Sequence, residues 1–131
     1  MDIAGLRVMV FEDDFLLAGT LADVLGRLGC TVVRCIAALD QAMEAARTEN
    51  CDFAVVDLQL QGVMAYPLLD CLAQRGIPCI IASCQSRHDI PPRYMSMPAI
   101  SKPYTAGELR RAIDIACGAG SARKPSDDSP D

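Results

Sequence analysis

The chain has 131 residues, 51% of them hydrophobic and none of them Trp, and a formal net charge of −5 from 17 acidic and 12 basic side chains. This length and apolar content suit one folded domain and exclude global disorder. The acidic balance disfavours nucleic acid as a partner, because phosphate binding needs clustered Lys and Arg. No apolar run approaches the ~18 residues that span a bilayer, and residues 1–5 lack the features of a signal peptide. We therefore expect a cytoplasmic domain with no membrane partner.

Short apolar runs alternate with helical patterns along the chain. In chain order they predict a strand over 6–11, a helix over 17–28, a strand over 31–36, a helix over 39–46, a strand over 53–56, a helix over 67–74, strands over 77–82 and 99–101, and a helix over 105–116. Gly29 and Gly76 are typical of helix ends, and Thr105 with Glu108 forms a capping box. Strands that are apolar on both faces and separated by helices indicate an α/β fold with a parallel sheet covered on both sides.

Two segments interrupt this rhythm. Residues 84–98 contain Pro91, Pro92 and Pro98, so we expect a short or irregular fourth helix there. Residues 118–131 have the composition of a disordered tail, which leaves one domain over residues 1–117. Of the two lysines, Lys124 lies in this tail, so Lys102 is the only Lys of the predicted domain.

Seven cysteines, at positions 30, 35, 51, 71, 79, 84 and 117, contain no C-x-x-C pair, and His88 is the only His. Zinc and redox sites need tighter spacing and usually His partners. We interpret the cysteines as small buried hydrophobic residues of a reducing compartment. A reactive thiol at Cys84, just after a strand, is the alternative.

Polar side chains follow the predicted strands at the points where the strands end. They are Glu12, Asp13 and Asp14 after the first strand, Asp57 after the third, Ser83 after the fourth and Lys102 after the fifth. The carboxyl ends of parallel strands lie on one rim of a sheet, where ligands bind. We therefore expect these residues to converge although they are far apart in the sequence.

The chemistry of this rim suggests a cation and a phosphoryl group. Clustered carboxylates repel one another unless a cation neutralises them, and their oxygens suit Mg²⁺. Lys102 offers a compact positive charge for a phosphoryl oxygen, and Ser83 offers a hydroxyl donor. With these neighbours, Asp57 is equipped to attack phosphorus and become an acyl phosphate.

Each of these residues also has a structural interpretation. Acidic residues after a strand often cap the next helix, and Asp13 or Asp14 fits that role. Asp57 is harder to explain in this way, because a carboxylate at the end of an apolar strand is costly unless it is paired. Ser83 and Lys102 are informative only in combination with the acids.

The matched positions resemble a response-regulator receiver domain of two-component signalling over roughly residues 5–117. The resemblance rests on residues 10–14, 55–58, 82–83 and 102–104. It implies a doubly wound, five-stranded parallel sheet of the flavodoxin-like order 2-1-3-4-5. It also implies Mg²⁺ held by Glu12, Asp13, Asp57 and the backbone carbonyl of Gln59. Asp57 would accept a phosphoryl group from a His of a partner histidine kinase or phosphotransferase, with Ser83 and Lys102 contacting that group.

Residues 64–70, 75–78 and 91–94 are similar to the stand-alone receivers of the FAT GUY type. The stretch after the fourth strand keeps the hydroxyl of Ser83 but loses the glycine and aromatic residue of that group. Ala99 stands where most receivers carry a switching Tyr or Phe, and Ser86 leaves the other aromatic position empty. Tyr104 or Tyr94 is a candidate substitute for this switch.

Three candidate functions follow from these features. The first is a single-domain response regulator, not a true enzyme, that signals by protein contact or onward phosphotransfer. The second is a receiver-fold adaptor that binds partners without phosphorylation, which the missing aromatic residues favour. The third is another α/β enzyme, against which the absence of a D-x-D after the first strand and of any P-loop or G-x-G-x-x-G argues.

Overall fold

The computed structural model describes residues 2–83 and 90–118. In chain order the elements are β1 (Arg7–Phe11), α1 (Phe15–Arg27), β2 (Thr31–Ile36), α2 (Leu39–Thr48), β3 (Phe53–Asp57), β4 (Gln59–Leu60), β5 (Val63–Met64), α3 (Tyr66–Gln74), β6 (Cys79–Ser83), the 3₁₀ turn η2 (Pro92–Tyr94), β7 (Ala99–Ser101), α4 (Ala106–Ile113) and the π-helical turn η3 (Asp114–Gly118). Among the described residues, no helix is long and apolar enough to cross a membrane.

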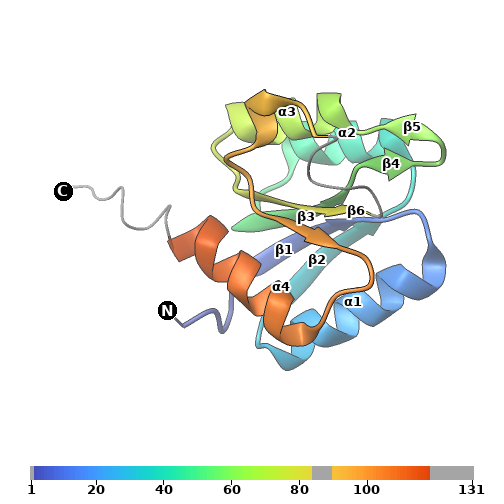
Figure 1. The fold of residues 1–131 in the computed structure, drawn as a ribbon. Helices are drawn as coiled ribbons and strands as arrows, with labels where there is room; N and C mark the ends of the chain where they lie inside the picture. Colours follow the sequence, from blue (N-terminus) through green and yellow to red (C-terminus); the bar gives the residue numbers. More distant parts are fainter. Residues whose placement is uncertain (1, 84–89, 119–131) are drawn as a thin grey trace.

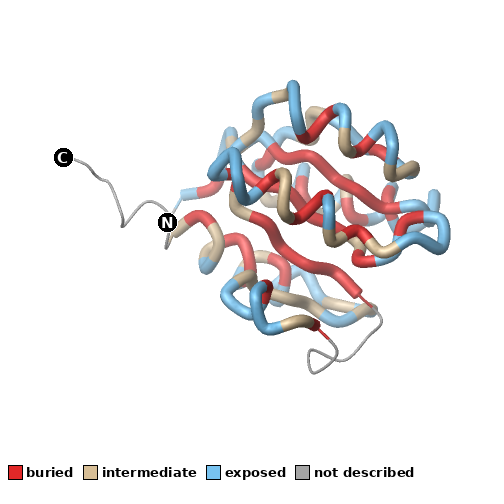
Figure 2. Tube along the Cα trace, turned by 90° about the horizontal axis from the view of Figure 1, so that it is seen from above, coloured by how far each residue is buried: buried red, intermediate tan, exposed pale blue. Residues whose placement is uncertain are grey.

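Five strands form one sheet in the order β2-β1-β3-β6-β7, and each neighbouring pair is parallel. This order confirms the predicted flavodoxin-like fold class, since the five strands taken in chain order read 2-1-3-4-5. The central strands β1, β3 and β6 are buried except for Arg7 at the start of β1 and Asp57 at the end of β3 (Figure 2). The predicted α/β sheet, covered on both sides, is therefore correct.

Alternate residues of each central strand enter two separate cores. Met9 and Phe11 pack on the side of α2 and α3, whereas Val8 and Val10 pack on the side of α1 and α4. Figure 1 shows the two pairs of helices on opposite faces of the sheet. Because side chains alternate along a strand, both faces of a central strand must be apolar to fill two cores.

The helices begin and end where their sequences favour it. Asp14 is the N-cap of α1, and its carboxylate accepts from the backbone N–H groups of Leu16 and Leu17 at 3.0 and 3.1 Å. Gly29, just after α1, has a φ of 98°, which glycine adopts without strain. The capping box of Thr105 and Glu108 is present at the start of α4. Of the two predicted cap candidates, Asp14 is the one that caps, which leaves Asp13 available for another role.

The end of α2 is held by a side chain that the sequence did not single out. The guanidinium of Arg75 donates to the carbonyl oxygens of Ala46 and Glu49, both at 2.6 Å, and to Oδ1 of Asn50 at 3.0 Å. The last carbonyls of a helix lack partners within the helix, and a cation there also opposes the negative end of the helix dipole. Arg75 thereby ties the loop after α3 to the end of α2.

The structure differs from the predictions in two places. A two-stranded antiparallel hairpin, β4–β5, follows β3 and was not predicted, because strands of two residues leave no periodic pattern. Cys35 is exposed, so the interpretation of the cysteines as buried is wrong there; β2 is an edge strand and exposes part of its length. The described part of 84–98 holds only the turn η2, as expected of a short or irregular helix. Gly118, the first residue of the predicted tail (118–131), is the last residue of η3, whereas Cys84 and residues 119–131 lie outside the described residues.

Candidate functional site

The carboxyl ends of the parallel strands bring the predicted residues together. Glu12 and Asp13 follow β1, Asp57 is the last residue of β3, and Lys102 follows β7 directly. One carboxylate oxygen from each of Glu12, Asp13 and Asp57 lies within 4.8 Å of the other two. The convergence expected from the parallel topology is therefore present in the structure.

The three carboxylates differ in their exposure to solvent. The Glu12 side chain is 4% exposed and that of Asp57 13%, whereas Asp13 is exposed. Burial raises the pKa of the Glu12 carboxyl, more than its hydrogen bond from Lys102 lowers it, and the nearby Asp57 also raises it. The site thus holds negative charge that is only partly shielded by water.

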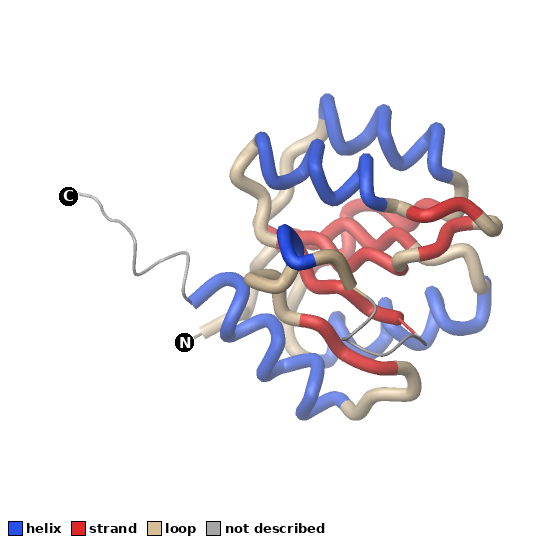
Figure 3. Tube along the Cα trace, turned by 45° about the horizontal axis from the view of Figure 1, so that its top comes forward, coloured by secondary structure: helices blue, strands red, loops and turns tan. Residues whose placement is uncertain are grey.

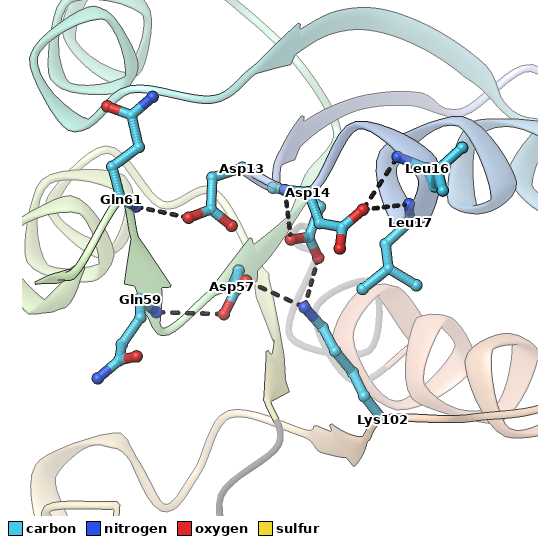
Figure 4. A network of polar contacts seen from close by, with 9 residues as sticks. Asp13, Asp14, Leu16, Leu17, Asp57, Gln59, Gln61 and Lys102 are labelled. Carbon is cyan, nitrogen blue, oxygen red and sulfur yellow. Dashed lines mark hydrogen bonds and ion pairs between the residues drawn. The ribbon is translucent and has the colours of Figure 1, made fainter.

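Lys102 supplies the positive charge at the centre of the site. Its Nζ lies 2.5 Å from Oε1 of Glu12 and 3.0 Å from Oδ2 of Asp57, and the side chain is 10% exposed. Burial alone would lower the pKa of this ammonium, but hydrogen bonds to the two carboxylates outweigh burial and raise it. Figure 4 shows the Lys102 side chain reaching into the cluster beside Asp57. The ammonium is therefore a firmly charged partner for two carboxylates.

Backbone N–H groups orient the carboxylates from the other side. The N–H of Asp14 donates to Oε2 of Glu12 at 3.1 Å, and the N–H of Gln59 donates to Oδ1 of Asp57 at 3.1 Å. The third donor is the backbone N–H of Gln61, which lies 2.6 Å from Oδ2 of Asp13 (Figure 4). It was not predicted, because the candidate residues were chosen for their side chains. The only sequence signal for it is the glycine at position 62, which favours a turn.

Ser83 closes the site on the side of β6. It is the last residue of this strand, is 5% exposed, and pairs with Ser101 of β7. Its carbonyl oxygen accepts from the backbone N–H of Lys102 at 2.9 Å, so the two residues are fixed next to each other through the main chain. Ser86, His88 and Cys84 lie outside the described residues.

A second polar network, not predicted, joins α3 to the turn η2. The Tyr94 hydroxyl donates to Oδ1 of Asp70 at 2.8 Å, and Arg93 forms an ion pair with Oδ2 of Asp70 at 3.0 Å. The rings of Tyr66 and Tyr94 are stacked with centroids 5.1 Å apart. Tyr94 is 2% exposed. Because Tyr94 is held in this way, it is part of the core beside α3, whereas Ala99 of β7 contributes no ring.

The oxygen donors suit a small, hard cation. Mg²⁺ prefers carboxylate, carbonyl and water oxygens and keeps several of its waters. Glu12, Asp13 and Asp57 offer carboxylates at a shared rim, and Asp13 leaves the site open to water on its exposed side. A divalent cation would also relieve the repulsion between the three acids.

Comparison with known proteins agrees with this geometry. A family model described as the response regulator receiver domain matches residues 8–114, most of the chain. The chain belongs to the response-regulator receiver family. Receivers are signalling domains of two-component systems, bind Mg²⁺ at an acidic pocket and interact with phosphodonors such as histidine kinases. This membership confirms the resemblance drawn from the sequence, whereas the likeness to the FAT GUY group stays a prediction.

Solved structures of receivers share the fold. SdrG from Sphingomonas melonis Fr1 is 26% identical with a TM-score of 0.77, over 88% of this chain and 98% of that one. The receiver domain of a modulated diguanylate cyclase from Desulfovibrio desulfuricans G20 is 26% identical with a TM-score of 0.82, over 92% and 99%. PhyR from Brucella abortus, at 22% identity and a TM-score of 0.77 over 91% and 50%, supports the fold alone. None of the curated proteins matches the chain.

Proposed function

We propose that this receiver accepts a phosphoryl group on Asp57 from a phosphohistidine of a partner histidine kinase or phosphotransferase, in a Mg²⁺-dependent reaction. The observation that carries the proposal is the Lys102 ammonium, 3.0 Å from Oδ2 of Asp57, inside a cluster of three carboxylates. A phosphoacceptor needs this combination of an attacking carboxylate, an ammonium and a cation site. Glu12, Asp13, Asp57 and the carbonyl of Gln59 would hold the ion.

In the proposed step a carboxylate oxygen of Asp57 attacks the phosphorus. The new O–P bond forms as the P–N bond of the phosphohistidine breaks, and the electron pair of that bond leaves with the imidazole nitrogen, which takes up a proton. The Lys102 ammonium and the Ser83 hydroxyl stabilise negative charge on the phosphoryl oxygens. Bound Mg²⁺ would neutralise part of the same charge. The product is an acyl phosphate on Asp57.

The consequence of this step is a signal, since the chain regenerates only itself and converts no separate substrate. We propose that it is not an enzyme in the ordinary sense and acts in the cytoplasm, where kinases of this class present their histidines. Its output is contact with a protein or onward phosphotransfer. The proposed contact surface is the final helix, α4, with the edge strand β7 and the proline-rich segment 91–98.

The test is intact mass analysis of the full chain incubated with acetyl phosphate and Mg²⁺. We expect an adduct of about 80 Da. It should not form when EDTA is added before acetyl phosphate, and it should not form on Asp57→Asn. Asp70→Asn is the matched control, because Asp70 is an acid of the Tyr94 network and lies outside the cluster. No adduct, or one that survives Asp57→Asn, contradicts the proposal.

An adaptor that works without phosphate is the second candidate function, favoured by Ala99 at the position where most receivers carry an aromatic residue. Beryllofluoride with Mg²⁺ separates the two candidates in an NMR titration. The phosphoacceptor predicts shifts of the amides of Ser83 and Lys102, whereas the adaptor predicts none.

A further inference from the structure

The hairpin β4–β5 lies directly after the phosphoacceptor strand, on the α2–α3 side of the sheet (Figure 3). Leu60 pairs with Val63, so the turn consists of Gln61 and Gly62 alone. Both have positive φ values, 53° and 82°, as a type I′ turn requires. The backbone N–H of Ala65 donates to the carbonyl of Leu58 at 2.7 Å and fixes the base of the hairpin.

The register of the hairpin determines which N–H groups face the acids. In an antiparallel pair, alternate residues direct their backbone groups toward the partner strand and away from it. Leu60 faces Val63 across the turn, so the N–H groups of Gln59 and Gln61 point to the other side. They meet the carboxylates of Asp57 and Asp13, at 3.1 and 2.6 Å.

Gln61 is an unusual residue for this conformation. Its φ of 53° lies in the left-handed region, which a type I′ turn usually fills with Asn, Asp or Gly. Its side chain is exposed and so contributes no packing that would offset the strain. What the conformation does achieve is the short hydrogen bond from its N–H to Asp13. Strained backbone at a site is a reason to look for a role in that site.

Asp13 needs such a donor more than its neighbours do. Among the described residues, Lys102 forms ion pairs with Glu12 and Asp57 and none with Asp13. Asp13 is exposed, stands on the loop after β1, and is repelled by two other carboxylates within 4.8 Å. Without the N–H of Gln61, its carboxylate would be free to turn into solvent, away from the cluster.

We propose that the backbone N–H of Gln61 is a positioning group for the cation site: it holds the Asp13 carboxylate toward Glu12 and Asp57 and so preorganises the site for Mg²⁺. This inference rests on the proposed function, because it assigns Asp13 to the ion. The role belongs to the main chain, so a substitution that keeps both the N–H and the positive φ preserves it. Partners of metal ligands typically change metal affinity by about 10-fold or more when they are lost.

The test replaces one atom. An α-hydroxy acid introduced at position 61 turns the peptide N–H into an ester oxygen, and the amino acid with the same side chain at position 61 is the matched control. Calorimetric titration of the full chain with Mg²⁺ is expected to show about 10-fold weaker binding for the ester than for the control. Gln61→Gly keeps the N–H and the turn, and is expected to bind Mg²⁺ as the parent does.

Two further measurements separate positioning from general stability. The ester's unfolding midpoint in EDTA reports the hairpin alone. In the Asp13→Ala background, which offers the Gln61 N–H no side-chain acceptor, the ester is expected to add less than 2-fold to the loss of Mg²⁺ affinity. Equal Mg²⁺ affinity of ester and control overturns the inference. Should the ester not fold, hydrogen exchange of the parent decides instead: we expect a protected Gln61 amide that becomes unprotected in Asp13→Ala, which has no side-chain acceptor, and rapid exchange in the parent overturns the inference.

The proposed function can fail separately from this inference. A parent that binds no Mg²⁺ and forms no acetyl phosphate adduct refutes both. A parent that binds Mg²⁺ and is phosphorylated on Asp57, with an ester variant of unchanged affinity, refutes only the role of Gln61.

Discussion

Lys102→Met removes the one ammonium that holds two buried carboxylates together. The side chains of Glu12 and Asp57 are 4% and 13% exposed, and each loses a charged partner at 2.5 and 3.0 Å. Met has a similar length and fills the same space, so packing changes little. The variant therefore isolates the charge, and we expect it to be less stable than the parent when no Mg²⁺ is present.

The size of the effect follows from the burial of the three groups. Removing one partner of a buried ion pair destabilises by about 3–5 kcal/mol, because an unpaired buried charge remains. The lower end applies here, since Glu12 already has a raised pKa and can take up a proton in place of the lost partner. About 3 kcal/mol corresponds to a fall of about 10 °C in Tm for a domain of this size.

Guanidinium unfolding followed by circular dichroism measures this loss in EDTA and in excess Mg²⁺. We expect Mg²⁺ to stabilise Lys102→Met more than it stabilises the parent, because the cation supplies the charge that the lysine no longer does. The double variant Lys102→Met with Glu12→Gln is the control. It is expected to recover about 1–2 kcal/mol of the loss, since one of the two stranded charges is gone.

Equal stabilities of Lys102→Met and the parent in EDTA would refute the reasoning, because the ammonium would then not compensate the buried acids. Additive effects of Lys102→Met and Glu12→Gln would refute the pairing in a different way. They would mean that the contact at 2.5 Å carries no coupling energy.

Three other predictions use the same unfolding assay. Arg75→Ala loses three hydrogen bonds at the end of α2 and is expected to lower the free energy of unfolding by about 1.5 kcal/mol, and Arg75→Lys by less. An unchanged free energy of unfolding in Arg75→Ala would contradict the capping role. Tyr94→Phe keeps the stacked rings but leaves Asp70 without its hydroxyl donor, for about 1 kcal/mol; an unchanged midpoint contradicts this. In EDTA, the stability contributed by Glu12 grows as the pH falls through the raised pKa of this carboxyl, and it is complete below 4.5, the usual pKa value. Glu12→Gln is expected to abolish this pH dependence. A pH dependence that persists in Glu12→Gln would have to come from another group.

The sheet and most of the site follow from the sequence because they depend on local patterns. The apolar runs identify the strands, and the parallel topology then requires that Asp57, which ends β3, and Lys102, which follows β7, share one rim. No distance has to be known for this conclusion. The conclusion needs only the correct assignment of the strands and their parallel arrangement.

The features that were missed depend on backbone geometry or on contacts between distant residues. Gln61 carries no side-chain chemistry at the site, and its role lies in an N–H direction set by a two-residue turn. Tyr94 and Asp70 lie 24 residues apart in the sequence, and no local sequence pattern predicts that η2 contacts α3. Arg75 enters the sequence analysis only within the stretch 75–78 that is similar to the FAT GUY receivers, and its contact with the end of α2 joins two elements far apart in the sequence.

The site compensates its three acids in two different ways, and the difference bears on how it would respond to a cation. Glu12 and Asp57 share the charge of the Lys102 side chain in addition to their backbone N–H donors, whereas Asp13 accepts from the backbone N–H of Gln61 and, among the described residues, pairs with no cationic side chain. In the proposed reaction, a cation that neutralises Glu12 would leave the Lys102 ammonium available to the oxygens of a phosphoryl group on Asp57. A fixed dipole cannot be redistributed in this way. The side-chain charge thus lies beside the residue proposed to be modified, and Asp13, which only has to stay in place, depends on a backbone donor.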